Sequence, residues 1–271
     1  MSTLKIPIPA DVAPSNRQLF EDNYKKILGV HRCSILFSCD HKIEHLNPID
    51  PEILFTTAAA LQPMVMAAPV GLIARYASDY PSIPYIAKVS DKTNLATDDD
   101  PLSTLLWDTN QVIQLQENSV DIVGIGITIY VGSDYESEMM AAAAQAILHA
   151  HAQGLVAIVW IYPRGSHIQQ SSLTNAQLLA GATGIATSLG ADMVKIKPPI
   201  DSYDWIKLAV QSAGNTKIVC AGLEKTTNEI LIERTTEYIR GGIAGVALGR
   251  NLFERSIAEA QNLVQALRAL N

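Results

Sequence analysis

The sequence predicts an α/β protein of the (β/α)8-barrel class, the TIM barrel. Short apolar, β-branched runs alternate along the chain with longer segments of helical period, which is typical of βαβ units and a parallel sheet. We count eight such runs, and 271 residues are close to the roughly 250 that one complete barrel needs. If the second run were not a strand, a flavodoxin-like open sheet would be the alternative.

The expected strands are short and largely apolar, and they lie near 33–39, 63–67, 84–89, 121–129, 155–161, 192–197, 217–221 and 244–248. The clearest helices lie between or after them, at 134–152, 174–188, 225–240 and 251–270. Asp134 is expected to cap the first of these helices, with Glu136 and Glu138 matching its dipole. An extra N-terminal helix over 15–28 should close the barrel floor. No linker or short repeat is visible, so we predict one domain over residues 1–271.

The composition limits the kind of protein and its partners. With 48% hydrophobic residues the chain can build a large core, and its net charge of −7 argues against a nucleic-acid or anionic-membrane surface. The three cysteines have no CxxC spacing, and the N-terminus shows no signal-peptide pattern. The longest apolar stretch, 58–74, is interrupted by Pro63 and Pro69 and does not predict a membrane span. We therefore expect a cytoplasmic enzyme that acts on a small molecule.

Reactive side chains follow the predicted strand ends. Because the active site of such a barrel lies at the C-terminal ends of its strands, residues from distant segments should meet on one rim. The candidates are Asp40, His41, Trp160, Tyr162, Arg164, Lys195, Lys197, Gly222, Gly249 and Arg250. This convergence is the strongest indication of catalysis that the residues provide.

Two lysines of the sixth strand indicate the chemistry. Lys195 and Lys197 are two residues apart, so their side chains share one face of the strand. If both point inward, burial and mutual repulsion favour a neutral amine, which is what attack on a carbonyl requires. If both point outward, they are ordinary lysines that reach solvent, and the spacing alone fits either arrangement.

Neighbouring residues suggest proton transfer and phosphate binding. Trp160 and Tyr162 also share a face, and an inward Tyr162 beside a reactive lysine could exchange a proton; otherwise it is an ordinary buried tyrosine. Arg164, in a Pro-Arg-Gly turn, is either a phosphate clamp or a solvated loop charge. Finally, glycine-containing turns at Gly222 and at Gly249-Arg250 stand where such barrels commonly bind phosphate.

Two other motifs fit less well. The segment His41 to His45 matches the H-x-x-E-H pattern of inverted zinc peptidases, but Pro48 and Pro51 leave little room for the helix that such a site needs. The Gly-Ile-Gly at 124–126 lies within a strand and lacks the third glycine of a dinucleotide loop. We expect His149 and His151 to be exposed or packing residues. No metal or cofactor site is predicted.

Several segments together resemble one known family. They are SCDHKIEH, ITIYVGSDYESEMM, VWIYPRG, GADMVKIK and GVALGRNLFER, and the likeness runs in register from about residue 30 to 260. These segments resemble the archaeal-type class I fructose-bisphosphate aldolases, which belong with the deoxyribose-phosphate and tagatose-bisphosphate aldolase-like TIM barrels. The resemblance implies a metal-free, cofactor-free aldolase that assembles as a homo-oligomer and binds a phosphorylated sugar.

The resemblance also implies roles for individual residues. Lys195 would form the Schiff base, Tyr162 would be the acid/base group, Asp40 a second polar active-site residue, and Trp160 would orient the carbon chain. Arg164 would contact a distal phosphate. A cradle for the proximal phosphate would be formed by Gly222, Gly249 and Arg250.

The chain departs from the family pattern at two loops. The family usually has DHG-x-EHG where this chain places Lys42 and Leu46, and it commonly reads SGG where this chain has Ala221-Gly222-Leu223. The lysine chemistry is unaffected, but the substrate is less certain to be a bisphosphate. The expected reaction is cleavage of a phosphorylated ketose, with fructose 1,6-bisphosphate first. The alternatives are a related transferase or thiolase that uses the same lysine, and a barrel that binds sugar phosphates without catalysis.

Overall fold

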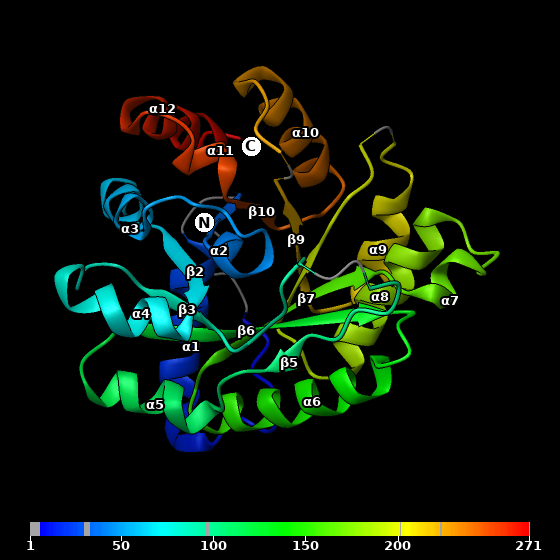
Figure 1. Ribbon diagram of the computed structural model, residues 1–271, viewed down its shortest axis with the longest axis horizontal. Helices are drawn as coiled ribbons and strands as arrows, with labels where there is room; N and C mark the ends of the chain where they lie inside the picture. Colours follow the sequence, from blue (N-terminus) through cyan, green and yellow to red (C-terminus); the bar gives the residue numbers. More distant parts are fainter. Residues whose placement is uncertain (1–5, 30–32, 96–97, 201, 223, 271) are drawn as a thin grey trace.

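The computed structural model describes residues 6–29, 33–95, 98–200, 202–222 and 224–270, and it contains a closed barrel of parallel strands. Around the barrel the order is β1-β10-β9-β8-β7-β6-β3-β2 (Figure 1). The strands are β1 (Ser34–Ser38), β2 (Val65–Pro69), β3 (Tyr85–Lys88), β6 (Ile122–Val131), β7 (Val156–Pro163), β8 (Met193–Ile196), β9 (Lys217–Ala221) and β10 (Gly245–Leu248). The predicted (β/α)8 barrel is confirmed, including its second strand, and the open sheet is excluded.

Helices surround the barrel, and several begin with the capping devices that their sequences predict (Figure 1). They are α1 (Arg17–Leu28), α2 (His41–Glu44), α3 (Pro51–Ala60), α4 (Val70–Tyr76), α5 (Thr109–Glu117), α6 (Glu136–Ala152), α7 (Ser166–Gln169), α8 (Asn175–Ser188), α9 (Trp205–Ala213), α10 (Asn228–Arg240), α11 (Arg250–Phe253) and α12 (Ile257–Arg268). Short 3-10 turns cover Pro14–Asn16 and Ala77–Asp79, and β4 (Ser90–Asp91) pairs with β5 (Thr104–Leu105) in a small antiparallel sheet.

Two helix predictions were wrong in detail. The segment expected as one helix over 251–270 is divided into α11 and α12, because Ser256 leaves the helical conformation and starts α12 with a capping box to Glu259. Asp134 does not cap α6, which begins at Glu136 after Tyr135. The Asp134 carboxylate instead lies 2.9 Å from His167 Nε2, and Glu136 accepts a hydrogen bond from the Gly132 N–H at 2.6 Å.

Two apolar layers build the core, as the alternation of side chains along each strand requires. One layer lies between the strands and the outer helices. The other fills the barrel interior and joins residues of all eight barrel strands to α1. It consists of Val12, Phe20, Tyr24, Ile27, Leu28, Leu36, Val65, Ala67, Ile86, Val123, Val156, Ile158, Trp160, Met193, Val219 and Ala247. The extra N-terminal helix thus packs against the barrel interior, which confirms the predicted floor.

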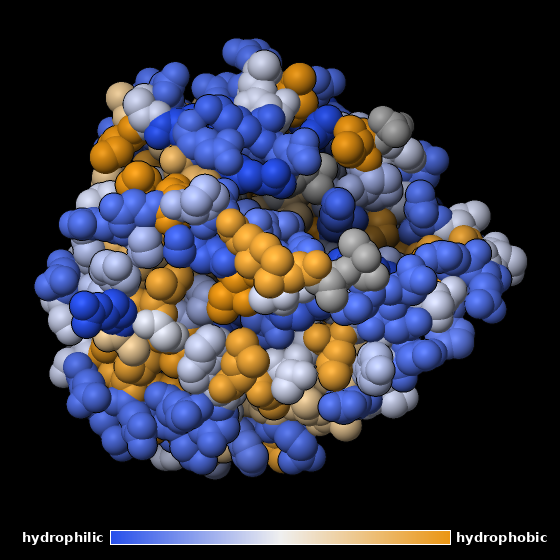
Figure 2. Space-filling view, viewed as in Figure 1, coloured by the Kyte–Doolittle hydropathy of each residue, from blue (hydrophilic) through white to orange (hydrophobic). Residues whose placement is uncertain are grey.

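The surface seen in Figure 2 is mostly hydrophilic, with apolar residues gathered toward its middle. This division fits a fold whose largest apolar side chains are buried in the two core layers. Among the residues that the structure describes, no helix is both long and apolar enough to cross a membrane.

A buried histidine ties the N-terminal segment to the barrel floor. His151, near the end of α6, is 1% exposed, and its Nδ1 lies 2.9 Å from the Asp11 carboxylate while its Nε2 lies 3.0 Å from Asp192 Oδ2. Asp192, just before β8, also accepts a hydrogen bond from the Ala157 N–H at 2.7 Å. Burial opposes a charge on His151, but the hydrogen bonds and charges of Asp192 and Asp11 outweigh it and raise the pKa of His151.

We expect His151→Gln to destabilise the fold by about 3 kcal/mol at pH 6, because it leaves the buried Asp192 carboxylate without a cation. A raised histidine pKa stabilises the fold fully below the unfolded value of about 6.5, and this contribution is lost as pH rises through the folded pKa. Urea unfolding at pH 6 and pH 8 should therefore show a larger gap between variant and wild type at the lower pH. Equal gaps at both pH values would contradict the charged state assigned to His151.

Candidate active site

The four candidate catalytic residues meet at the C-terminal end of the barrel. Lys195 lies in β8, Trp160 and Tyr162 in the neighbouring β7, and Asp40 two residues beyond β1. In the parallel register of β7 and β8, Trp160 is opposite Lys195. Three of the side chains are buried, with exposed fractions of 6% for Lys195, 1% for Trp160 and 5% for Asp40. Lys195 therefore has the inward orientation, not the outward one that the spacing also allowed.

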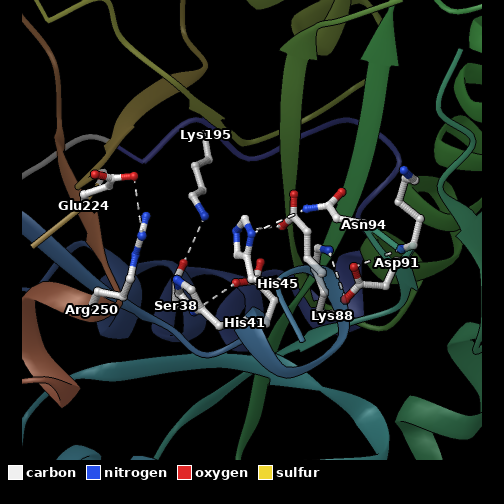
Figure 3. Close-up of polar contacts among 12 residues, drawn as sticks. Ser38, His41, His45, Lys88, Asp91, Asn94, Lys195, Glu224 and Arg250 are labelled. Carbon is white, nitrogen blue, oxygen red and sulfur yellow. Dashed lines mark hydrogen bonds and ion pairs between the residues drawn. The ribbon is translucent and has the colours of Figure 1, made fainter. Parts of the chain in front are cut away.

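Lys195 reaches across the barrel interior toward the first strand. Its Nζ donates a hydrogen bond to Ser38 Oγ at 3.1 Å, as Figure 3 shows, and lies 5.2 Å from the centroid of the Trp160 ring. Burial lowers the pKa of Lys195, while the carboxylates of Asp40 and Glu44 act in the opposite sense. The amine is consequently easier to deprotonate than a surface lysine, which suits a nucleophile.

Asp40 is an acidic side chain surrounded by basic ones. Burial by itself would raise the pKa of this carboxyl group, but the charges of Lys195, Lys88 and His41 hold it well below its usual range. His41 Nδ1 lies 3.7 Å from Asp40 Oδ1, and burial lowers the pKa of His41 to about 4. Asp40 is thus an ionised carboxylate at neutral pH and can accept a proton from a substrate.

Tyr162, the tyrosine of the candidate site, keeps its phenolic proton because of its surroundings. Its ring centroid lies 6.0 Å from that of Tyr130, whose hydroxyl donates to Glu44 Oε1 at 3.5 Å. Burial, followed by the charges of Glu44 and Asp40, raises the pKa of Tyr162 well above its ordinary value. The phenol stays protonated near neutral pH.

The second lysine of the predicted pair does not belong to the site. Strand β8 ends at Ile196, and Lys197 lies beyond it and is exposed. The shared-face argument fails there because the strand conformation on which it depends has ended. A different lysine, Lys88 at the end of β3, is 1% exposed and lies 5.7 Å from the Trp160 ring centroid.

The turn after β10 carries two of the candidate phosphate residues. A Cβ atom at Gly249 would lie 2.2 Å from His41 Cε1 and 2.9 Å from the Ser38 carbonyl oxygen, so only glycine fits between these neighbours. Arg250 starts α11, and its guanidinium lies 3.8 Å from the Glu224 carboxylate (Figure 3). Glu224 is largely exposed, so this ion pair is weak and can be exchanged for another anion.

The two remaining phosphate candidates are placed differently. The N–H of Gly222 donates to the Ala247 carbonyl at 2.8 Å and so is not free for an anion; a Cβ there would lie 2.4 Å from Leu248 Cδ2. Gly222 therefore leaves room for the Leu248 side chain. Arg164 follows β7, and its guanidinium carbon lies 5.6 Å from the Tyr130 ring centroid, which orients it across the mouth of the site.

The departures from the family pattern have local structural consequences. Lys42 donates to the carbonyls of Asn47 and Ile49, at 3.3 and 2.6 Å, and so holds the loop that follows Asp40. Leu46 has φ +50°, a left-handed conformation that favours glycine. The loop thus keeps a glycine-type backbone although leucine occupies it. The third departure, Leu223, lies outside the described residues.

Sequence reasoning missed several members of the site: Ser38, Glu44, Lys88 and Asp91. Lys88 ends a predicted strand and could have been found by the rule that identified Asp40 and Lys195. Gly126 was considered only as part of a nucleotide motif, yet a Cβ there would lie 2.4 Å from Trp160 Cζ3. Its role is to leave room for the Trp160 ring, which could not be inferred before the strands were placed side by side.

Most of the buried polar side-chain atoms without a hydrogen-bond partner gather at the same end of the barrel, whereas Tyr24 Oη lies in α1. Within the described ranges they include His41 Nδ1, Asp91 Oδ2, Lys92 Nζ, Asn94 Oδ1, Trp160 Nε1 and Arg250 Nε. Buried polar groups are usually paired, so such a cluster indicates a place where a polar ligand completes the bonds.

The zinc-peptidase alternative has little structural support. The helix α2 spans only His41–Glu44, and His41 and His45 have ring centroids 5.4 Å apart. His45 instead faces Asn94, with Nδ1 and Nδ2 3.4 Å apart (Figure 3). Over the described residues, no group of three or more His, Cys, Asp or Glu side chains is arranged to hold a metal ion.

Comparisons with known proteins agree with this geometry. The chain is 37% identical to the fructose-bisphosphate aldolase/6-deoxy-5-ketofructose 1-phosphate synthase of Methanocaldococcus jannaschii, over 98% of this chain and 90% of the relative. Its structure is similar to that of a fructose-bisphosphate aldolase from Slackia heliotrinireducens, with a TM-score of 0.92, 39% identity, and coverage of 98% and 89% of the two chains.

A further similar structure is that of an archaeal fructose-1,6-bisphosphate aldolase whose catalytic lysine is covalently bound to the carbinolamine intermediate of the substrate. It has a TM-score of 0.79 and 28% identity, with coverage of 93% of this chain and 100% of that one. The model of the DeoC/LacD family aldolases matches residues 34–255. The barrel, the inward lysine and these matches agree, and the chain belongs to the DeoC/LacD family of aldolases.

Proposed function

We propose that this protein is a class I fructose-bisphosphate aldolase, which reversibly cleaves fructose 1,6-bisphosphate to dihydroxyacetone phosphate and glyceraldehyde 3-phosphate. The observation that carries the proposal is the buried amine of Lys195 at the C-terminal end of the barrel, beside Asp40 and Tyr162. The names of the similar proteins support the same substrate.

The charge states of these residues suggest an order of steps. The neutral Lys195 amine attacks the C2 carbonyl. The carbinolamine takes up a proton from solvent and loses water, which gives an iminium that withdraws electrons from C3, and the final hydrolysis returns that proton. The Asp40 carboxylate accepts the proton of the C4 hydroxyl, the C3–C4 bond breaks, and the aldehyde leaves. The electrons of the broken C3–C4 bond remain on the Lys195-bound fragment as an enamine, and Tyr162 protonates this enamine at C3. Water then releases dihydroxyacetone phosphate from Lys195, and the proton on Asp40 returns to Tyr162.

The test of this function is the cleavage of fructose 1,6-bisphosphate by the purified protein, followed as triose phosphate released. A parallel assay tests fructose 1-phosphate, other sugar phosphates and acyl acceptors as substrates. Cleavage of the bisphosphate with the highest kcat/KM is expected. Turnover of an acyl acceptor instead would support the thiolase or transferase alternative, and no turnover of any sugar would support a binding protein.

A second aldol activity is suggested by the Methanocaldococcus relative. The name of that protein includes synthesis of 6-deoxy-5-ketofructose 1-phosphate, a ketose with a phosphate at C1 only.

Two arginines are candidates for binding the phosphates of the substrate: Arg250 lies on one side of the site and Arg164 on the other. We propose that Arg250, with Gly249 and Gly222 shaping the turn, binds the proximal phosphate and that Arg164 binds the distal one. We further propose a cytoplasmic homo-oligomer.

We expect Arg250→Ala to raise KM for fructose 1,6-bisphosphate and fructose 1-phosphate alike, by roughly ten- to a hundred-fold, since a charge-assisted bond to phosphate contributes about 1.5–3 kcal/mol. Arg164→Ala should penalise only the bisphosphate, because the monophosphate has no distal group. The measurement is kcat/KM for both sugars in both variants. Equal losses for the two sugars in Arg164→Ala would remove the distal role.

A further inference from the structure

A second buried lysine lies beside Lys195, and the steps proposed above do not use it. Lys88 ends β3 and is 1% exposed. Its Nζ lies 5.7 Å from the centroid of the Trp160 ring, and Lys195 Nζ lies 5.2 Å from the same centroid. Two lysine side chains from different strands thus converge on one indole inside the barrel.

Local structure holds the Lys88 ammonium group in place. Its Nζ donates to the Ser90 carbonyl at 2.8 Å and lies 3.7 Å from Asp91 Oδ2, whose side chain is 3% exposed (Figure 3). A Cβ at Gly126 would lie 3.3 Å from Lys88 Cδ, so this glycine makes room for the lysine as well as for Trp160. Lysine is almost never fully buried unless it is paired, because burying its charge is costly. Here the Ser90 carbonyl and the Asp91 carboxylate offset that cost, and Gly126 provides the space.

We propose that Lys88 is a positioning residue of the active site: its buried ammonium group favours the neutral, nucleophilic form of the Lys195 amine, and Asp91 is its counter-ion. This inference rests on one part of the proposed function, the assignment of Lys195 as the nucleophile. Lys88 then has the role that the sequence assigned to Lys197, but from a strand on the other side of β6 and β7.

The charged groups that face Lys195 act in opposite directions. Burial lowers the pKa of Lys195 most; the carboxylates of Asp40, Glu44 and Asp91 raise it, and the charge of Lys88 lowers it. Burial also raises the pKa of Asp91 to about 6, against the effect of Lys88, so the Asp91 carboxyl group is still largely ionised at neutral pH. Removing Lys88 and removing the charge of Asp91 should therefore shift Lys195 in opposite directions.

The test measures the protonation of Lys195 without using a sugar. The protein is reductively methylated with formaldehyde and cyanoborohydride from about pH 6 to about pH 10, and the rate at Lys195 is read by peptide mass spectrometry. Lys88→Met should move the midpoint up by about one pH unit and slow labelling at neutral pH roughly tenfold. Asp91→Asn should move it down, Lys88→Arg should restore the wild-type midpoint, and Lys197→Met, an exposed control, should leave it unchanged.

An unchanged midpoint in Lys88→Met, or a shift of Asp91→Asn in the same direction, would show that Lys88 only supports the fold. If Lys88→Met does not fold, Asp91→Asn and Lys88→Arg decide: an Asp91→Asn midpoint equal to wild type overturns the proposal. Because formaldehyde replaces the substrate, these shifts are separate from the cleavage assay. If the variants show these midpoint shifts but the protein cleaves no sugar, the role of Lys88 stands and the proposed aldolase reaction is rejected.

Discussion

Lys195→Ala should abolish both covalent trapping and cleavage. Borohydride reduction in the presence of dihydroxyacetone phosphate should label wild-type protein at Lys195 and leave the variant unlabelled. The loss in kcat should be on the order of 10⁶-fold, the scale on which removal of a covalent nucleophile is felt in other enzymes. The physical reason is the position of this amine: Lys195 Nζ donates to Ser38 Oγ and lies beside the Trp160 ring. No other lysine in the described part of the chain makes both contacts.

Lys197→Ala is the matched control for this experiment. It removes a lysine two residues away that is exposed and lies beyond the end of β8. Trapping and turnover should stay within about twofold of wild type, because surface substitutions seldom change the fold energetics by more than about 0.5 kcal/mol. Normal labelling in Lys195→Ala, or loss of labelling in Lys197→Ala, would assign the nucleophile to a different residue.

The elements of the barrel could be predicted because each strand carries its own local signal. A run such as LVAIVWI is apolar, contains β-branched residues and follows Gly154, and it became β7 within two residues of its predicted limits. The same local rule placed Trp160 and Tyr162 on one face of their strand, since alternation needs only the strand itself, but it did not decide whether Lys195 points inward or outward. Helix starts were less predictable, because the true cap at Ser256 competes with a helical pattern that runs through it.

What could not be predicted depends on contacts between strands. Gly126 is required because the Trp160 ring from the next strand occupies the space of its side chain. Lys88 could have been recognised as a lysine near a strand end, but its contact with the ring that Lys195 also approaches exists only in the closed barrel. Gly222 was assigned an anion contact, but its N–H is used by the neighbouring β10. Each case concerns a partner that is distant in sequence, about which local periodicity carries no information.

Tyr162→Phe and Asp40→Asn should each lower steady-state kcat by about 10²–10⁴-fold, the range expected for loss of a general acid or base, but they should stop the reaction at different points. Tyr162→Phe keeps the Asp40 carboxylate, so the C3–C4 bond should still break. The enamine then lacks its proton donor, and the variant should release a burst of glyceraldehyde 3-phosphate stoichiometric with its sites before it stalls.

Asp40→Asn should give no aldehyde burst, because the amide cannot accept the proton of the C4 hydroxyl. Iminium formation should survive, since the Asp40 charge opposes the loss of a proton from Lys195 and its removal lowers the pKa of that amine further. Borohydride should therefore trap the intact bisphosphate on Lys195 in this variant, recognised by the mass of its adduct. Rapid-quench measurement of the aldehyde distinguishes the two variants. A burst in Asp40→Asn and none in Tyr162→Phe would exchange the two roles, because the group that accepts the C4 proton must act before the aldehyde can leave.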